Sequence, residues 1–158
     1  MYSYLFPIST IHGMGKKIKI PIQLISLQED GFHLFVEGKL GTHIVRMLID
    51  TGASKTVIDK NFISDNLPEL ELETNEQLTT GVGSNTIQSE FTDLTILEVG
   101  KLKLKGYKVA VLDLKHVNET YNMIQLPPIQ GVIGCDLLVE HKAVINLKKK
   151  EIKLSPYK

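Results

Sequence analysis

Apolar and polar residues alternate in short runs along most of this chain, and the runs end at glycine, proline or other turn residues. Alternation with a period of two places the apolar side chains on one face of a strand, so each run predicts a half-buried β-strand. Strands are expected over residues 19–27, 32–37, 42–49, 132–133, 143–147 and 152–154, the first two forming a hairpin, and at least three more between residues 86 and 114. In the last region we expect turns at Gly100-Lys101 and Lys105-Gly106.

Helical signals are short and few. Residues 59–66 form a helix candidate that Pro68 stops, and residues 116–125 are a weaker helix or loop candidate. Residues 136–140 predict a helix with Asp136 near its N-cap, and Lys148 to Lys150 fit a solvated turn. The chain shows no internal repeat or linker, so we expect one mostly β domain over residues 19–158, preceded by an N-terminal segment of uncertain role, 1–18.

Charge and cysteine content exclude several kinds of partner. Eighteen basic residues balance eighteen acidic ones, which gives no reason to expect a nucleic acid or an anionic membrane. One cysteine, Cys135, excludes an internal disulfide and a multi-cysteine metal site. No apolar stretch is long enough to span a membrane, and the first residues lack the basic start of a secretory signal. We therefore expect a soluble, cytoplasmic protein without a membrane partner.

The most informative segment is the apolar strand that runs into Asp50-Thr51-Gly52-Ala53. The break at Gly52 would present the Asp50 carboxylate on a tight loop beside an apolar core. Asp50 can act as a general acid or base, Thr51 can hydrogen-bond the loop, and Gly52 leaves room for a second backbone. The ordinary alternative is an Asx-type turn at a strand end, because the three-residue motif occurs by chance in roughly 5% of chains of this length.

A second motif argues against an ordinary Asx-type turn at Asp50. Far downstream, Val132-Ile133-Gly134 places two apolar residues and a glycine ahead of a short apolar helix. With these two motifs the sequence resembles the retropepsin-like aspartic proteases, the single-domain relatives of pepsin that include the retroviral proteases. The likeness runs from about residue 32 to residue 154, and residues 143–154 resemble the closing hairpin of bacterial members. It implies a closed retropepsin-like acid-protease β-barrel in which Gly134 threads beside the Asp50 loop.

The resemblance also implies a mechanism. Aspartic proteases use two carboxylates that share one proton, because two like charges at contact distance cannot both ionise cheaply. This chain has a single Asp-Thr-Gly, so the pair would be assembled in a homodimer from Asp50 of each copy, and Thr51 would reach across to the partner's loop. The implied activity is that of an aspartic endopeptidase on a peptide or protein substrate, without a metal or other cofactor.

A glycine-rich stretch, Gly81-Val82-Gly83, lies where the family places its flap. Glycines would let a hairpin tip bend over a bound peptide and exclude water. A phosphate-binding loop is a weak alternative, because no Gly-Lys-Ser/Thr follows. Substrate binding would then use backbone hydrogen bonds to an extended peptide and apolar pockets for alternate side chains.

The chain departs from the retroviral pattern at two positions. Ser54 and Cys135 stand where those proteases have an acidic residue and an arginine that brace the dimer, so the dimer contact must differ. The stretch between Asp113 and Gly131 is also longer than in a minimal retroviral enzyme, and it would line the substrate groove or shape the interface.

The remaining reactive side chains have ordinary interpretations. We expect Cys135 to be a buried small side chain and Asp136 to be a helix cap. The five histidines are scattered, without metal-ligand spacing, and read as surface or strand residues.

Two rival functions stay open at this stage. The first is a catalytically silent retropepsin-like dimer that binds peptides or serves as a scaffold. The second is a monomeric β-barrel that binds a small apolar ligand.

Overall fold

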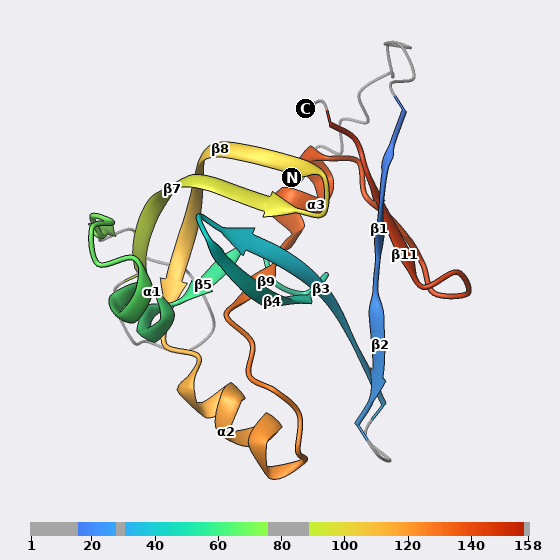
Figure 1. The fold of residues 1–158 in the computed structure, drawn as a ribbon, viewed down its shortest axis with the longest axis horizontal. Coiled ribbons are helices and arrows are strands. Elements are labelled where there is room, and N and C mark those ends of the chain that lie inside the picture. Colours follow the sequence, from blue (N-terminus) through green and yellow to red (C-terminus); the bar gives the residue numbers. More distant parts are fainter. Residues whose placement is uncertain (1–15, 28–30, 76–88, 157–158) are drawn as a thin grey trace, which may run out of the picture.

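The computed structural model describes residues 16–27, 31–75 and 89–156, and its main feature is a closed, strongly twisted β-barrel (Figure 1). The strands that form the larger sheet are β2 (Gln23–Ser26), β3 (Phe32–Leu40), β4 (His43–Ile49), β5 (Val57–Asp59), β6 (Glu73–Asn75), β7 (Ser89–Val99), β8 (Leu102–Leu112) and β9 (Gly131–Ile133). Their order is β2-β3-β4-β9-β5-β8-β7-β6, and an extra pairing between β3 and β7 closes the ring. The predicted mostly β, closed fold is confirmed.

Two short strands at the centre of the sheet come from distant parts of the chain. β9 runs parallel to β4, with Leu48 opposite Val132, and antiparallel to β5. β5 in turn runs parallel to β8. The end of β4, where Asp50 follows, is therefore held next to the end of β9, where Gly134 follows.

The long hairpin of β7 and β8 corrects one sequence prediction. The turn at Gly100-Lys101 is present, but Lys105-Gly106 lies inside β8, where Gly106 has a φ of 56°. Pairing between the strands pauses there and resumes in the same register, with Leu94 opposite Tyr107 and Ile96 opposite Lys105. The positive φ bends the hairpin rather than ending it. Because of this bend the tip of the hairpin reaches β3, where Val99 pairs with Gly38.

The expected strand over residues 19–27 divides between two sheets. Its first half, β1 (Ile18–Pro21), pairs with β11 (Glu151–Leu154), which also pairs with β10 (Val144–Asn146) in a separate three-stranded sheet. Its second half, β2, pairs with β3 in the predicted hairpin. The division falls at Ile22, whose backbone N–H donates to the carbonyl of Lys150 in the turn between β10 and β11 (2.8 Å). Residues 148–150 lie in that turn, as predicted.

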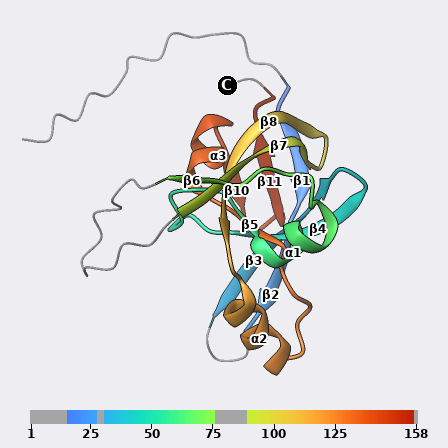
Figure 2. The same ribbon diagram turned by 90° about the vertical axis from the view of Figure 1, so that its left-hand side faces the viewer.

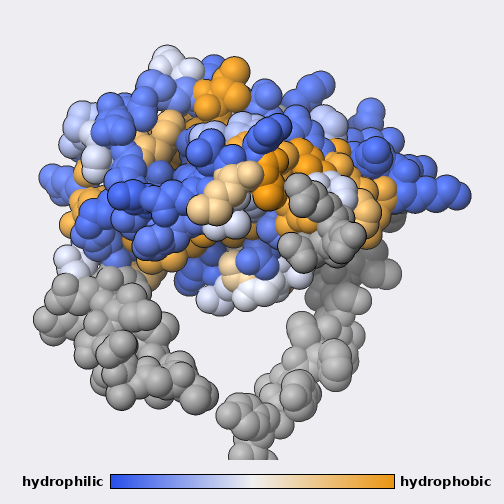
Figure 3. Space-filling model, turned by 90° about the horizontal axis from the view of Figure 1, so that it is seen from below, coloured by the Kyte–Doolittle hydropathy of each residue, from blue (hydrophilic) through white to orange (hydrophobic). Residues whose placement is uncertain are grey.

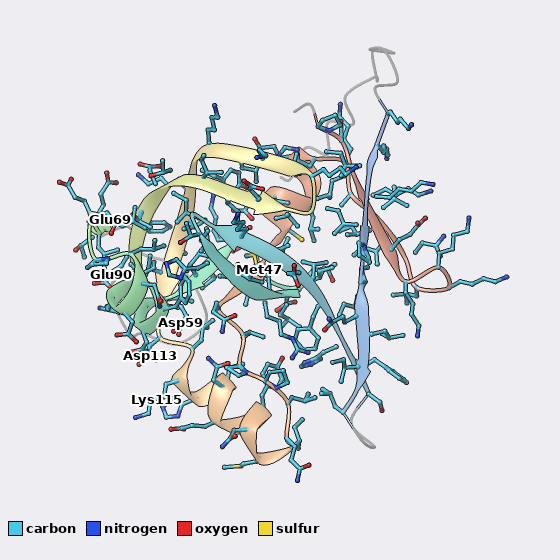
Figure 4. All side chains as sticks on the ribbon, in the orientation of Figure 1. Met47, Asp59, Glu69, Glu90, Asp113 and Lys115 are labelled. Carbon is cyan, nitrogen blue, oxygen red and sulfur yellow. The ribbon has the colours of Figure 1, made fainter. Side chains whose placement is uncertain are left out.

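Three short helices flank the barrel (Figure 2). They are α1 (Lys60–Asn66), α2 (Lys115–Met123) and α3 (Cys135–Glu140). α1 begins after Asp59 as predicted, but the Asp59 side chain makes no cap hydrogen bond. Its buried carboxylate instead accepts the backbone N–H of Leu114 (3.0 Å), which joins the start of α1 to the end of β8. Figure 4 labels Asp59, Asp113 and Lys115 along this junction.

Apolar side chains form two clusters on opposite faces of the strands. On the inner face, Val45, Met47 and Ile58 belong to the main core, and Figure 4 labels Met47 at its centre. Their neighbours along the strands, Leu48 and Val57, face the other way into a second cluster. The second cluster, which we call the outer cluster, joins Phe35, Val57, Ala110, Leu114, Tyr121 and Ile129. It fills the space between the barrel and α2.

Candidate active site

The loop after β4 presents the predicted catalytic residue at the surface. Asp50 is exposed, and its backbone N–H donates to the carbonyl of Ile133 (3.0 Å), so the β4–β9 ladder continues one residue past the strand. The chain then turns sharply, because the N–H of Ala53 donates to the Asp50 carbonyl (3.2 Å). The N–H of Gly52 donates to the Asp50 carboxylate Oδ1 (2.8 Å). This bond fixes one carboxylate oxygen, and no described residue donates a hydrogen bond to the other, which can therefore act on a ligand.

The downstream motif threads beside this loop, as the resemblance implied. The backbone N–H of Cys135 donates to the Ala53 carbonyl (2.7 Å). A Cβ atom on Gly134 would lie 2.4 Å from the carbonyl carbon and oxygen of Lys55, far inside van der Waals contact. Only glycine fits here without moving backbone. The predicted neighbours Val132 and Ile133 supply the strand that leads into this crossing.

A polar network that sequence reasoning missed locks the crossing. The Asp136 carboxylate Oδ1 accepts hydrogen bonds from the backbone N–H and the hydroxyl of Thr56, both at 2.8 Å. The Thr56 hydroxyl oxygen also accepts the N–H of Gly134 (3.2 Å). Burial, together with the nearby Asp136 and Glu140 carboxylates, raises the pKa of Tyr107 well above its ordinary value. Tyr107 therefore remains a neutral hydrogen-bonding group behind the loop.

The prediction that Asp136 caps the N-terminus of α3 is wrong, because another residue occupies the N-cap position. Gly134 is the N-cap of α3, and Asp136 lies in the first turn, where its carboxylate accepts the N–H of Leu137 (2.8 Å) as well as the Thr56 donors. The Asp136 carboxylate therefore mainly joins α3 to Thr56, rather than stabilising the helix alone. A carboxylate that accepts several hydrogen bonds holds them more strongly than a neutral group would.

Two other expectations about single side chains need correction. Cys135 is half-buried rather than buried, and its Sγ donates to the Thr51 carbonyl (3.0 Å). His141 is neither a surface nor a strand residue, because it follows α3 and is only 1% exposed, with Nδ1 2.8 Å from the Ser155 carbonyl. Within the described ranges, no three His, Cys, Asp or Glu side chains gather where they would hold a metal ion.

The residues predicted for the flap, Gly81, Val82 and Gly83, lie outside the described residues. Thr51 and Gly52 are exposed beside Asp50, and Ala53 is half-buried. The loop that would meet a second copy is thus on the surface of the single chain, as is Ser54.

The stretch between Asp113 and Gly131, whose role the sequence left open, packs against the face from which Asp50 emerges. Alternation along β4 puts Arg46, Leu48 and Asp50 on the same face. Leu48 belongs to the outer cluster, and the ring of Tyr121 from α2 meets the ring of Phe35 edge-on, with centroids 5.8 Å apart. The hydroxyl of Tyr121 lies 2.7 Å from His33 Nδ1, which ties α2 to β3.

The surface at this end of the molecule is partly apolar. Exposed Val117 and Met123 on α2, and Phe32 at the start of β3, are among the large apolar side chains that face solvent. Figure 3 views this end and shows apolar surface gathered between polar regions. Exposed apolar patches of this kind mark binding surfaces more often than chance.

Comparison with known proteins agrees with this geometry. Many solved structures are similar to the chain, and two of them show the shared fold at identities low enough that only the fold is compared. The retroviral protease-like domain of Ddi1 from Leishmania major is 17% identical, with 77% of this chain and 87% of that one covered and a TM-score of 0.53. A retropepsin-like aspartic protease from Rickettsia conorii is 22% identical, with 89% and 96% covered and a TM-score of 0.52.

No curated protein sequence matches the chain significantly. In the part of the chain that the structure describes, no helix is long and apolar enough to cross a membrane. The family model described as "Aspartyl protease" matches residues 36–137, more than half of the chain, and spans both the Asp50 loop and the Gly134 crossing. The chain therefore belongs to the aspartyl protease family and has the retropepsin-like fold.

Proposed function

We propose that this protein is an aspartic endopeptidase that works as a homodimer, with its catalytic domain over residues 19–158. The observation that supports this most is the exposed Asp50 carboxylate, fixed by the N–H of Gly52 on a loop that the Gly134 crossing holds rigid. A carboxylate placed in this way is preorganised but has no second motif of its kind in the sequence. The second catalytic carboxylate would therefore come from Asp50 of another copy.

In this proposal the two Asp50 carboxylates share one proton. The ionised carboxylate takes a proton from a water molecule as that water attacks the scissile carbonyl, and the protonated one donates to the developing oxyanion. The tetrahedral intermediate collapses with cleavage of the C–N bond, and the amine leaves with a proton from the pair. Thr51 and Gly52 would support the loop, and residues 81–83 would cover the substrate.

The dimer would use surfaces other than the retroviral brace, since Ser54 and Cys135 cannot form an ion pair. The three-stranded sheet of β1, β11 and β10 offers one such surface. β10 pairs only with β11 among the described strands, and Val144 on it is half exposed, as is Leu147 in the turn that follows. An open strand edge with apolar side chains is a common site of association.

The first test is cleavage of a diverse peptide library from acid to neutral pH by the wild type and by Asp50→Asn. We expect cleavage by the wild type alone. Asp65→Asn, on the exposed face of α1, is the matched control and should cleave like the wild type. Silence of all three proteins, with a dimer present in the same buffer, would favour a peptide-binding or scaffolding module instead.

A mixing experiment tests the shared site. When wild-type and Asp50→Asn chains are co-expressed in equal amounts and pair at random, about one quarter of the dimers carry two Asp50 carboxylates. If both carboxylates are needed, the activity should fall to about one quarter of that of the same amount of wild type. Chains that each worked alone would leave one half of the activity. A value near one half, or sedimentation of an active monomer, would contradict the homodimeric mechanism.

A further inference from the structure

Arg46 on β4 is a cation with two unused hydrogen-bond donors. Its guanidinium carbon lies 4.0 Å from the centre of the Phe35 ring, and burial lowers the pKa of Arg46. Nε and Nη2 are both buried, and neither has a hydrogen-bond partner among the residues that the structure describes. Arg46 as a whole is half-buried, but each buried N–H donor without an acceptor costs the fold about 1–3 kcal/mol.

No acidic residue of the described chain supplies an acceptor for these donors. Glu37 stands directly opposite Arg46 on β3, yet no ion pair joins the two side chains, and none joins Arg46 to any other described carboxylate. The reason is the direction of the arginine side chain. The guanidinium lies over the ring of Phe35, which pairs with Leu48, and is therefore displaced by one residue pair along the strands from Glu37.

The unused donors are a matched pair. Nε and Nη2 form one edge of the planar guanidinium, and their two N–H groups point in parallel at the spacing of the two oxygens of a carboxylate. An amide offers a single acceptor oxygen and satisfies one of them well. A carboxylate satisfies both and also neutralises the charge, so the chemistry of this edge favours a carboxylate.

Arg46 lies on the face of β4 from which the candidate catalytic loop emerges, about 13 Å along the strand from Asp50. Arg46 and Asp50 share one face of β4, four residues apart. Burial is the main cause that raises the pKa of Tyr121, while the Arg46 cation lowers it and the Asp50 carboxylate raises it, so Tyr121 lies in the field of both. A cavity of about 350 Å³ adjoins Arg46 and is lined by Gln23, Glu37, Ile44, Pro127, Pro128 and Gln130.

We propose that Arg46 is a specificity-determining residue that binds an acidic side chain of the peptide substrate through Nε and Nη2. This inference rests on the proposed function, in that it names a substrate class for the same site. Because Nε and Nη2 are buried where they lie, the proposal requires the guanidinium to turn off Phe35 into the adjoining cavity when the peptide binds, by a change of rotamer that leaves the backbone in place. Glu37 at the same cavity repels anions, so the preference depends on the paired donors and not on a general positive field.

The test measures binding separately from cleavage. One extended octapeptide is synthesised with a single Glu at each position in turn, and with Gln at the same positions as the matched uncharged set. Affinities are measured by calorimetry on the intact Asp50→Asn protein, which cannot consume the peptides. At one position we expect Glu to bind about 10-fold more tightly than Gln, as one charge-assisted bidentate contact would give.

Two substitutions of Arg46 in the same background identify the donor pair. Arg46→Lys keeps the charge and loses the planar edge, and Arg46→Met removes the charge; both should abolish the Glu preference. Lys39→Met removes a different cation from the same face of the β3–β4 pair and should leave the preference intact. Thermal denaturation of each variant separates a loss of binding from a loss of fold, and Arg46→Lys serves if Arg46→Met does not fold.

Cleavage of the same peptides by the wild type separates this inference from the proposed function. Glu-selective binding that Arg46→Lys abolishes supports the inference even if no peptide is cleaved, in which case the endopeptidase proposal fails. Equal or absent binding of Glu and Gln peptides overturns the inference, whether or not the wild type cleaves them. Persistence of the preference in Arg46→Lys overturns it as well, because charge alone would then explain it.

Discussion

The Gly134 crossing and the outer cluster lie on the same strands but are held in different ways. At the crossing, backbone meets backbone, with the N–H of Cys135 on the Ala53 carbonyl and no room for a Cβ on Gly134. In the outer cluster, rings and aliphatic side chains fill the space between the barrel and α2, and beside it Nε and Nη2 of Arg46 have no hydrogen-bond partner among the described residues. At the crossing, backbone contacts fix the position of Asp50. In the outer cluster the contacts are made by side chains, so other residues can replace them. Our proposals accordingly assign the chemistry to the Asp50 loop at the crossing and the choice of substrate to Arg46 beside the outer cluster.

The largest expected effect is at the crossing. Gly134→Ala forces a Cβ to within 2.4 Å of Lys55 backbone atoms, so we expect it to lower the free energy of unfolding by about 3 kcal/mol or more. Gly106→Ala is the control, because nothing lies within 4 Å of its Cβ and only the left-handed φ costs about 1 kcal/mol. Urea denaturation of both variants gives the comparison. Equal losses would mean that the crossing yields as easily as an open bend.

The next effect concerns the network behind the loop. Thr56→Val removes the hydroxyl that donates to Asp136 and accepts from Gly134, and should cost about 2 kcal/mol. Thr92→Val removes one hydrogen bond, to the Glu71 carbonyl (2.8 Å), from an equally buried threonine and should cost about 1 kcal/mol. Peptide cleavage, normalised to folded protein, should fall only in Thr56→Val. A comparable fall in Thr92→Val would argue against a specific role of the crossing in placing Asp50.

Sequence reasoning predicted the crossing well because its signals are local. An apolar strand, Asp50-Thr51-Gly52 and the later Val132-Ile133-Gly134 each carry their own pattern, and the fold brings them together. The Thr56–Asp136 pair has no such signal, since the two residues are 80 positions apart and an aspartate early in a helix fits a cap equally well. The same limit explains His141, whose burial depends on packing that no local pattern encodes.

The errors in the fold have a similar origin. Gly106 carries the signal of a turn, and a left-handed glycine bends a long hairpin as well as it ends a strand. The run over residues 19–27 alternates continuously, yet β1 and β2 pair with strands in different sheets, and alternation does not reveal the partner. Strand existence was therefore predictable, whereas pairing and continuity were not.

The outer cluster provides the third test. Tyr121→Phe removes the hydroxyl that lies 2.7 Å from His33 Nδ1 and keeps the ring against Phe35, so it should cost about 1 kcal/mol in the free energy of unfolding. His33→Phe removes the other partner, and the double variant should show that the two losses are not additive. A loss in Tyr121→Phe that equals or exceeds that in Thr56→Val would contradict the contrast between a tightly fixed crossing and a more tolerant cluster.

The smallest effect is expected at Asp113, two residues before α2 begins. The Asp113 carboxylate accepts the N–H of Lys115 (2.8 Å) and the side-chain N–H of Asn61 (2.9 Å), and these two bonds, in that order, hold the pKa of Asp113 below its ordinary value of 3.8. A carboxyl whose pKa is lowered by folding stabilises the fold above its unfolded pKa, and that stabilisation disappears as the pH falls through the folded pKa. Asp113→Asn should therefore be slightly less stable than the wild type at neutral pH, and the difference should close below about pH 3.8. Thermal denaturation of both proteins across this range measures it, with Asp65→Asn as an exposed control. A gap that widens toward acid pH would show that the Asp113 contacts oppose the attachment of α2 instead of supporting it.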